Sequence, residues 1–318
     1  MSVIALGAML LYFCKVIADR RYDIVDEHRI SDRVLHVQVQ HKLVGEPQKW
    51  LKINFGGRLG NNMFQLASAI GLSKLHNKLL CVRNSKIKSS LNAIFKISLP
   101  PECPPDVQFV KETEKGYAKH QVFIANGNTE IGTYLQSWKY FHSAKKIIKR
   151  TFRFQPHLYL KARRLLPKKK LRDGHLIGIH VRRGDKITRH HYLRFPDDDY
   201  FESVFVKFPD SHVLVVSEDI PWCKTFHVFK KYKSRIYFQD EKVPPAVDMI
   251  LLSMCDVVVL TMGTFGWWGA YLSDGQVIYN PNEFVMSDAV NKGNVVKEDY
   301  YLLHWNAPKV KKTNIEKE

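Results

Sequence analysis

The chain has 318 residues, of which 45% are hydrophobic and 25% are charged. This length and apolar content exclude a disordered tail and allow one large core or two packed domains. The formal net charge of +18 at pH 7 favours an anionic partner: a polyanion, a phosphorylated small molecule or an acidic membrane. Most of the excess basic residues lie in short runs without interleaved aromatic residues, which favours solvated helix faces over a nucleic-acid-binding surface.

Residues 1–18 contain an apolar run from Ser2 to Cys14 that is interrupted at Lys15. A membrane-spanning helix needs about 20 mostly apolar residues, so the run is marginal in length. Because it lacks both a basic leader and a small-x-small cleavage site, an uncleaved anchor is predicted rather than a signal peptide. Residues 19–48 are polar and charged without a sustained period, which is typical of a stem or linker.

The predicted elements of residues 49–172 alternate between strand and helix. They occur in this order: a strand at 50–55, a glycine-rich turn, a helix with apolar positions from Met63 to Leu75, a second strand, an irregular proline-rich connection at 99–106, and helices at 139–154 and 158–166.

Residues 173–306 repeat the alternation more clearly. Strands are predicted at 176–181, 212–217, 235–238, 256–261 and 276–280, and helices at 199–208, 222–232, 246–255 and 265–273. Strands that are almost continuously apolar and alternate with helices imply a parallel sheet covered on both faces. The expected fold class is therefore α/β, with a Rossmann-like domain over 173–306.

Cysteine, aspartate and histidine patterns predict no metal site and no cofactor. Four cysteines follow the apolar run, without the spacing of zinc ligands: Cys81, Cys103, Cys223 and Cys255. A Cys81–Cys103 disulfide and free buried thiols are equally compatible with this pattern. The triplet Asp197–Asp199 formally fits a metal-holding Asp-x-Asp motif, but a helix N-cap with acidic residues in the first turn is favoured. Adjacent histidines such as His190 and His191 rarely share one metal.

Two arginines follow the predicted strand at 176–181. Ligands of open α/β sheets bind at the carboxyl ends of strands, and guanidinium groups suit phosphate oxygens because they keep their charge. Arg182 and Arg183 are therefore candidate phosphate ligands, beside Gly184. The competing interpretation is a structural arginine pair bonded to Asp185 and other nearby carboxylates.

A second candidate site lies at the strand-to-helix turn that contains Gly263 and Thr264. Free amides and hydroxyls there can hold an anion at the positive end of the helix. Trp267 and Trp268 are expected in the core. Asp248 is the lone acidic residue of the preceding predicted helix, and it can cap that helix or accept hydrogen bonds from N1 and N2 of a guanine.

The glycine-rich segment 56–65 does not place its glycines as in the dinucleotide-binding motif. It is predicted instead to bring four polar side chains to a cleft: Arg58, Asn61, Asn62 and Gln65.

Five segments in the same order resemble glycosyltransferase family 11, the α-1,2-fucosyltransferases. They are GGRLGNNMFQLASAIGLSKLHNKLL, LQSWKYF, IGIHVRRGD, VLVVSEDIPWC and DMILLSMCDVVVLTMGTFGWWGAYLS. The resemblance implies two Rossmann-like domains of the glycosyltransferase-B type with parallel sheets. The N-terminal, acceptor-side domain would cover 49–172, the C-terminal, donor-binding domain 173–306, and a basic tail 307–318.

The resemblance further implies an inverting transfer of L-fucose from GDP-β-L-fucose to a galactose hydroxyl of a glycan, with the 2-OH expected. It implies a single-pass type II Golgi membrane protein with a lumenal catalytic domain, although the short anchor and the missing N-terminal basic residues depart from that pattern. The expected partners are GDP-fucose, a galactose-terminated glycan and the membrane, and no nucleic acid. The alternatives are another linkage, another nucleotide-sugar transferase, or a glycan-binding protein without catalysis.

Roles of single residues follow from the same resemblance. Carried over by position, Arg182 would contact the GDP diphosphate, and Arg183 would support the diphosphate or the loop. His180 would line the nucleotide pocket, and Asp248 would recognise guanine. Thr264, next to Gly263, would bond a phosphate oxygen. A fixed charge at Arg182 would stabilise the leaving diphosphate without magnesium. Asp185 is the first candidate for a general base and Glu218 the second.

Overall fold

The computed structural model describes residues 48–83, 85–112, 126–132, 134–166, 175–184, 192–285 and 296–308. The predicted anchor, the stem up to residue 47, the tail from residue 309 and the candidate residues Asp185, His190 and His191 lie outside the described residues. Within the described ranges, no helix combines the length and the apolar character that crossing a membrane requires.

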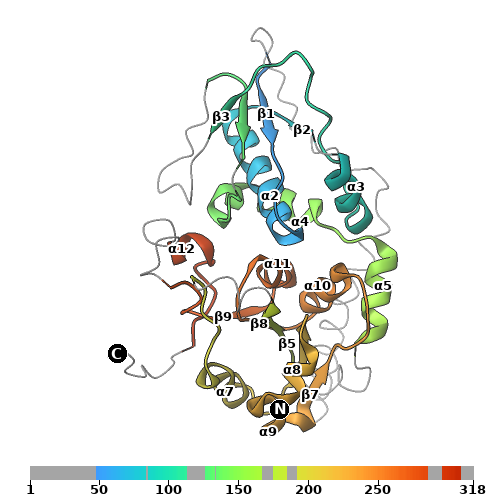
Figure 1. The fold of residues 1–318 in the computed structure, drawn as a ribbon, viewed down its shortest axis with the longest axis vertical. Helices are drawn as coiled ribbons and strands as arrows, with labels where there is room; N and C mark the ends of the chain where they lie inside the picture. Colours follow the sequence, from blue (N-terminus) through green and yellow to red (C-terminus); the bar gives the residue numbers. More distant parts are fainter. Residues whose placement is uncertain are drawn as a thin grey trace, which may run out of the picture. The chain divides into compact units, whose positions relative to one another are not determined.

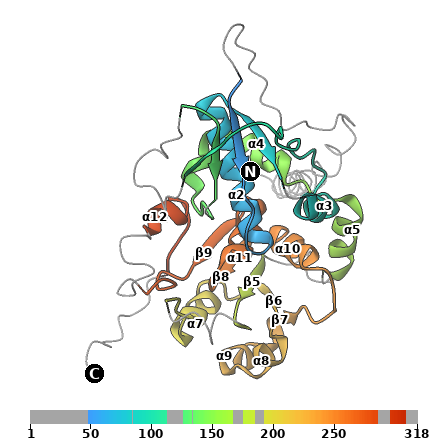
Figure 2. The same cartoon turned by 45° about the horizontal axis from the view of Figure 1, so that its top comes forward.

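The second half of the chain forms a five-stranded parallel sheet with the strand order β7-β6-β5-β8-β9 (Figures 1 and 2). Its strands are β5 (Leu176–Val181), β6 (His212–Ser217), β7 (Ile236–Phe238), β8 (Val257–Leu260) and β9 (Gln276–Tyr279). All six residues of β5, the central strand, are buried. A central strand covered on both faces explains why its sequence is apolar at nearly every position.

Helices cover both faces of this sheet. Alternate strand residues point to opposite faces: Ile177 and Ile179 join a cluster with the helices α7 (Asp198–Lys207), α8 (Ile220–Thr225) and α9 (His227–Lys231). Leu176 and Leu214 join a second cluster with α10 (Pro245–Ser253) and α11 (Thr264–Ser273). A short 3₁₀ turn, η2 (Lys233–Arg235), precedes β7.

The first half forms a separate four-stranded parallel sheet with the order β2-β1-β4-β3. Its elements are β1 (Trp50–Ile53), α2 (Leu59–His76), β2 (Leu79–Val82), α3 (Ser85–Ile94), β3 (Val110–Glu112) and β4 (Thr129–Ile131). A disulfide between Cys81 and Cys103 ties β2 to the irregular proline-rich connection. Cys223 and Cys255 are buried free thiols. The α/β class with parallel sheets is confirmed.

Helix α2 lies between the first sheet and α11, as two views show (Figures 1 and 2). Phe64 of α2 packs its ring 4.4 Å from that of Trp267, and Trp268 donates its indole N–H to the Gly60 carbonyl at 3.0 Å. Both tryptophans are fully buried, which confirms their predicted place in the core. The apolar core of the first half therefore continues into that of the second.

Three helical elements follow the first sheet, and a fourth follows the second. They are η1 (Trp138–Ala144), α4 (Lys145–Thr151), α5 (Pro156–Leu165) and α12 (Lys297–Tyr300). α5 packs on α10 of the second half. The segment around α12 returns to the first half, where the Trp138 indole N–H donates to the Tyr301 carbonyl at 3.1 Å. The chain thus crosses between the two sheets more than once.

Two predicted helices differ from the structure. The single helix expected at 222–232 is wrong, because Phe226 adopts an extended conformation and separates α8 from α9. This break lets the Phe226 ring stack on Trp222 at 4.7 Å and contact Phe201 at 5.3 Å. The helix expected at 139–154 is a 3₁₀ segment followed by α4, with the Ser137 hydroxyl accepting the Lys139 N–H at the start.

Candidate active site

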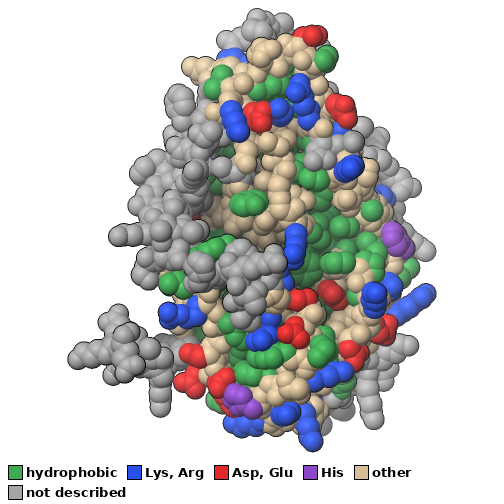
Figure 3. All heavy atoms as spheres, in the orientation of Figure 1, with side chains coloured by type: hydrophobic (Ala, Val, Ile, Leu, Met, Phe, Trp, Pro, Cys, Tyr) green, Lys and Arg blue, Asp and Glu red, His purple; other side chains and the backbone are tan. Residues whose placement is uncertain are grey.

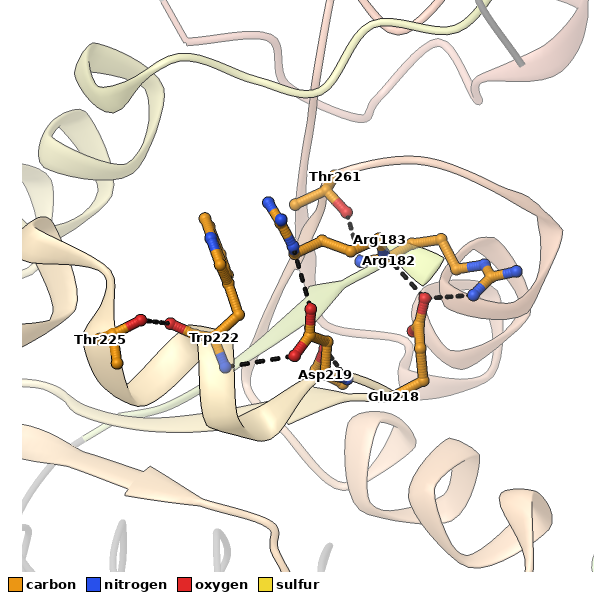
Figure 4. Close-up of polar contacts among 8 residues, drawn as sticks. Arg182, Arg183, Glu218, Asp219, Trp222, Thr225 and Thr261 are labelled. Atoms are coloured by element: carbon orange, nitrogen blue, oxygen red, sulfur yellow. Dashed lines mark hydrogen bonds and ion pairs between the residues drawn. The ribbon is translucent and has the colours of Figure 1, made fainter. Parts of the chain in front are cut away.

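The tip of β5 is tied to the tip of β8 by hydrogen bonds. The backbone N–H of Arg182 donates to the Thr261 hydroxyl at 2.9 Å (Figure 4). This hydroxyl donates in turn to the His180 carbonyl at 3.0 Å. The loop that carries both arginines therefore starts from a fixed point at the carboxyl edge of the sheet, where open α/β sheets bind their ligands.

Arg182 forms an ion pair with Glu218, which follows β6. The same carboxylate oxygen accepts the backbone N–H of Arg183 at 2.8 Å. The Arg182 side chain is only 14% exposed, whereas that of Glu218 is 35% exposed. In this arrangement Glu218 orients the guanidinium and fixes the loop.

Arg183 has a different set of partners, visible in Figure 4. Its Nε lies 3.3 Å from Asp219, and its guanidinium carbon lies 3.7 Å from the centroid of the Trp222 ring. Asp219 also accepts the Trp222 backbone N–H at 3.2 Å and so caps α8. These contacts favour the second of the two predicted roles for Arg183, which is support of the loop.

The start of α11 offers a turn suited to an anion. Gly263, the N-cap residue, has φ of +87°, a backbone conformation that side-chain-bearing residues rarely adopt. Its N–H donates to the Glu283 carboxylate at 2.8 Å, and the other oxygen of Glu283 accepts from the Tyr301 hydroxyl. Among the residues that the structure describes, no side chain caps α11, and its first turn has no acidic residue. Its first amides, which carry partial positive charge, are thus suited to an anionic ligand.

Sequence reasoning missed Glu283. It is buried at 3% exposure, in the segment after β9, and its partners lie 18 to 20 positions away in the chain. A single acidic residue outside any periodic element gives no signal for such a role.

The start of α2 meets the start of α11. The Thr264 hydroxyl donates to the Asn61 side-chain carbonyl at 2.9 Å, and that oxygen also accepts from the Gln136 amide at 3.1 Å. Gly60 makes the approach possible, because a Cβ there would lie 2.6 Å from the Thr264 hydroxyl. With its proton engaged by Asn61, Thr264 can offer a ligand its backbone N–H but no hydroxyl proton.

The four polar residues of the glycine-rich segment do not share one environment. Gln65 is buried and holds the glycine loop, since its side-chain oxygen accepts the Gly56 N–H at 3.0 Å. Asn62 is also buried. Arg58 is exposed at the N-cap of α2, and Asn61 is half-buried at the contact with α11. Of the four, only Arg58 and Asn61 are therefore accessible enough to contact a ligand in a cleft.

His180 and Asp248 are both titratable groups with shifted pKa values. Burial, with a smaller contribution from the Arg182 charge, lowers the pKa of His180 to about 3, so this imidazole is neutral. Its ring lies 5.4 Å from that of Phe265, beside the first turn of α11. Burial raises the pKa of Asp248 to about 6, and a 3.3 Å hydrogen bond from Gln239 partly opposes the shift.

The N-cap interpretation of the aspartate triplet is confirmed. The Asp197 carboxylate accepts the Tyr200 N–H at 2.9 Å, and Asp198 and Asp199 occupy the first turn of α7. No group of three or more metal-ligating His, Cys, Asp or Glu side chains occurs within the described ranges.

The face drawn in Figure 3 shows lysine and arginine side chains spread over the surface and interspersed with acidic ones. This distribution fits solvated helix faces. The charge that matters for an anion is instead local, at Arg182 and the neighbouring helix starts.

Comparison with known proteins gives the family. The model of glycosyl transferase family 11 matches residues 21–309. Galactoside alpha-(1,2)-fucosyltransferase 1 of Oryctolagus cuniculus is 28% identical over 264 residues, which cover 73% of this chain and 66% of the relative. The protein of the same name from Homo sapiens is 26% identical over 259 residues, which cover 73% and 68%. The chain thus matches about two thirds of the length of these relatives.

Solved structures give weaker likenesses. The fucosyltransferase NodZ from Bradyrhizobium has a TM-score of 0.46 and 13% identity, covering 70% of this chain and 93% of NodZ. POFUT1 in complex with GDP has a TM-score of 0.47 and 11% identity, covering 72% and 96%. A likeness of this size assigns no ligand. The family match, however, spans both sheets and every described residue that forms the candidate site, and the chain belongs to glycosyl transferase family 11.

Proposed function

We propose that the protein transfers L-fucose from GDP-β-L-fucose to the 2-OH of a galactose unit in a glycan, with inversion at the anomeric carbon. Family membership and the α-(1,2)-fucosyltransferase names of the relatives support the reaction class. The structural observation that carries it is Arg182, held at the carboxyl edge of a parallel sheet beside the start of α11.

Charge stabilisation at the leaving group is the first part of the mechanism. As the bond between fucose and the β-phosphate breaks, negative charge grows on the diphosphate. Arg182 keeps its positive charge at any physiological pH, and the amides of α11 add partial positive charge. Donors that are already in place stabilise developing charge without reorganisation. These groups take the role that a magnesium ion plays in metal-dependent enzymes. Fucose transfer is therefore expected to persist when EDTA removes divalent cations.

Glu218 competes with the diphosphate for Arg182. A guanidinium has five N–H donors in a planar fork, so Arg182 can hold Glu218 through Nη1 and a phosphate oxygen through others. The ion pair favours an orienting role for Glu218 over that of general base. Asp185 remains the first candidate to accept the proton of the galactose 2-OH.

Asp248 is the residue proposed to recognise the guanine base of the donor. Its carboxylate sits in the first turn of α10 and is oriented by Gln239, which follows β7. A carboxylate accepts from N1–H and the N2 amine of guanine together, which no other base offers in that pattern. In the proposed glycosyltransferase-B arrangement, the second sheet holds the donor and the first sheet, with Arg58 and Asn61, faces the acceptor.

The proposed location is the Golgi membrane, with the apolar run near the N-terminus as a type II anchor. The Cys81–Cys103 disulfide supports a lumenal catalytic region, because disulfides persist in the oxidising secretory compartments and are rare in the cytosol. Protease protection of the tagged full chain in intact microsomes tests this topology.

The direct test measures transfer of radiolabelled fucose from GDP-fucose to a panel of β-galactosides. It compares wild type with Arg182→Ala and with the control Arg164→Ala, which changes an exposed arginine of α5. Transfer is expected for wild type and Arg164→Ala and severe loss for Arg182→Ala, with the product cleaved by an α-1,2-specific fucosidase. Unchanged turnover by Arg182→Ala would refute the proposed mechanism. Transfer from another sugar nucleotide, without transfer from GDP-fucose, would refute GDP-fucose as the donor.

A further inference from the structure

An exposed aromatic side chain follows β4 at the carboxyl edge of the first sheet. Tyr134 is 51% exposed, and it is the one aromatic residue among the large apolar side chains that the described ranges leave exposed. Its ring lies beside the glycine loop after β1, since a Cβ at Gly56 would be 3.8 Å from Tyr134 Cε1. Tyr134 thus occupies, on the first sheet, the edge that corresponds to the donor edge of the second.

The backbone next to Tyr134 is strained. Leu135 has φ of +49°, in the left-handed region that a branched side chain rarely occupies. Packing holds it there: its side chain is buried, and its carbonyl accepts from the Ser68 hydroxyl at 3.0 Å and from the Ser137 N–H at 2.8 Å. Such strain is typical of functional sites, and here it buries Leu135 while Tyr134 stays exposed.

A chain of hydrogen bonds joins this loop to the donor side. Gln136 donates to Asn61, and Asn61 accepts from Thr264 at the start of α11. The neighbouring Gly263 lies close to Arg182, because a Cβ at Gly263 would be 3.9 Å from Arg182 Cγ. Tyr134 therefore stands on the loop that contacts the donor-binding turn.

We propose that Tyr134 is the stacking platform for the galactose unit of the acceptor, an inference that rests on the proposed transfer reaction. A galactopyranose has one face of C–H groups, whose positive hydrogens suit the negative face of an aromatic ring. A tyrosine offers this area at low entropic cost, because it has only two side-chain torsions. Stacking there would hold the sugar beside Asn61 and Gln136.

Enzyme kinetics separates this role from a structural one. Tyr134→Ala is expected to raise the KM for N-acetyllactosamine about fivefold to tenfold and leave the KM for GDP-fucose unchanged. Tyr134→Phe keeps the ring and is expected to retain wild-type acceptor KM. The matched control is Val110→Ala, which truncates an exposed apolar residue at the opposite edge of the same sheet.

Binding without turnover separates the inference from the proposed function. Saturation-transfer NMR on N-acetyllactosamine with GDP present is expected to show galactose signals for wild type, Tyr134→Phe and Val110→Ala, and their loss for Tyr134→Ala. Equal signals and equal acceptor KM for wild type and Tyr134→Ala would overturn the platform. An equal rise of both KM values would also overturn it. Wild-type binding without any fucose transfer would refute the proposed function alone.

Discussion

At the scale of single residues, Arg182 and Arg183 are adjacent in sequence but have different partners. Arg183 is stacked on Trp222 and paired with Asp219, so its charge is used inside the protein. Arg182 is paired with Glu218, whose side chain is the more exposed of the two, at the edge where a donor would bind. Arg183 thus fits the interpretation as a structural arginine, whereas phosphate binding by Arg182 is part of the proposal.

This division predicts opposite effects of two alanine variants. Arg183→Ala should lower the free energy of unfolding by about 1 to 2 kcal/mol, because it removes a cation–π contact and a partly exposed ion pair. Arg182→Ala should change stability less and GDP affinity more. Urea unfolding of both variants measures the loss of stability, and titration with GDP measures the loss of affinity. Equal losses of stability would contradict the division.

Asp248 predicts a pH dependence. Its native pKa of about 6 lies above its ordinary value of 3.8, so between these values the native state binds more protons than the unfolded state. Stability from this residue therefore falls as pH rises through that window, and the full cost is present above pH 6. Guanine needs the carboxylate, so GDP affinity should fall as the pH drops below 6.

Asp248→Asn separates the two effects. It should raise the free energy of unfolding at pH 7.5 by about 2 kcal/mol, because no buried charge remains. It should also weaken GDP binding about tenfold or more. The control is Asp210→Asn, at an exposed carboxylate between α7 and β6, which should change neither. Full GDP affinity in Asp248→Asn would refute guanine recognition by this residue.

At the scale of elements, the site is built from a strand tip and two helix starts. Glu283 fixes the turn before α11 by accepting the Gly263 N–H, and through Tyr301 it connects this turn to the segment that follows α12. Asn61 fixes the start of α2 against the same turn. The geometry of the candidate anion site is thus set by polar contacts between elements rather than by the loop alone.

Removal of the Glu283 carboxylate should disturb that turn. Glu283→Ala leaves the Gly263 N–H and the Tyr301 hydroxyl without this acceptor, which costs about 1 to 3 kcal/mol of stability. Its KM for GDP-fucose should rise while its acceptor KM stays constant. Glu283→Gln keeps an acceptor for Gly263 and should restore most of the donor KM. Tyr301→Phe, which removes only the other contact, should leave it unchanged. A Glu283→Ala variant with wild-type donor KM would contradict the role.

The sequence predicts these elements much better than their contacts. Branched apolar runs place β5, β6, β8 and β9 within a residue or two, and the glycines mark both turns. The pairs Arg182–Glu218 and Thr264–Asn61 join residues 36 and 203 positions apart, and strand order rather than local pattern brings them together. The same holds for Glu283 and for Tyr134, whose exposure depends on the strained Leu135 next to it.

At the scale of the whole described region, the two sheets share one apolar cluster, while the cluster with α7, α8 and α9 belongs to the second sheet alone. α2, η1 and α11 meet in an aromatic cluster that includes Phe64, Phe141, Trp267 and Trp268. α5 and the segment around α12 each cross from one half to the other. The halves are thus expected to unfold together rather than in two steps.

Urea unfolding tests this cooperativity. Tryptophan fluorescence and far-UV circular dichroism should give one coincident transition. Trp268→Ala should lower the free energy of unfolding by about 3 to 5 kcal/mol and keep a single transition, because it empties the middle of the shared core. Leu303→Ala, at an exposed position, is the control. Two separate transitions in wild type would show independent halves.

The most direct measurement of the central claim compares GDP with GMP by isothermal titration calorimetry, in wild type and in Arg182→Ala. If Arg182 receives the charge of the diphosphate, wild type binds GDP much more tightly than GMP, and Arg182→Ala loses most of that difference while its GMP affinity barely changes. A variant that keeps the full preference for GDP would show that the diphosphate is held elsewhere.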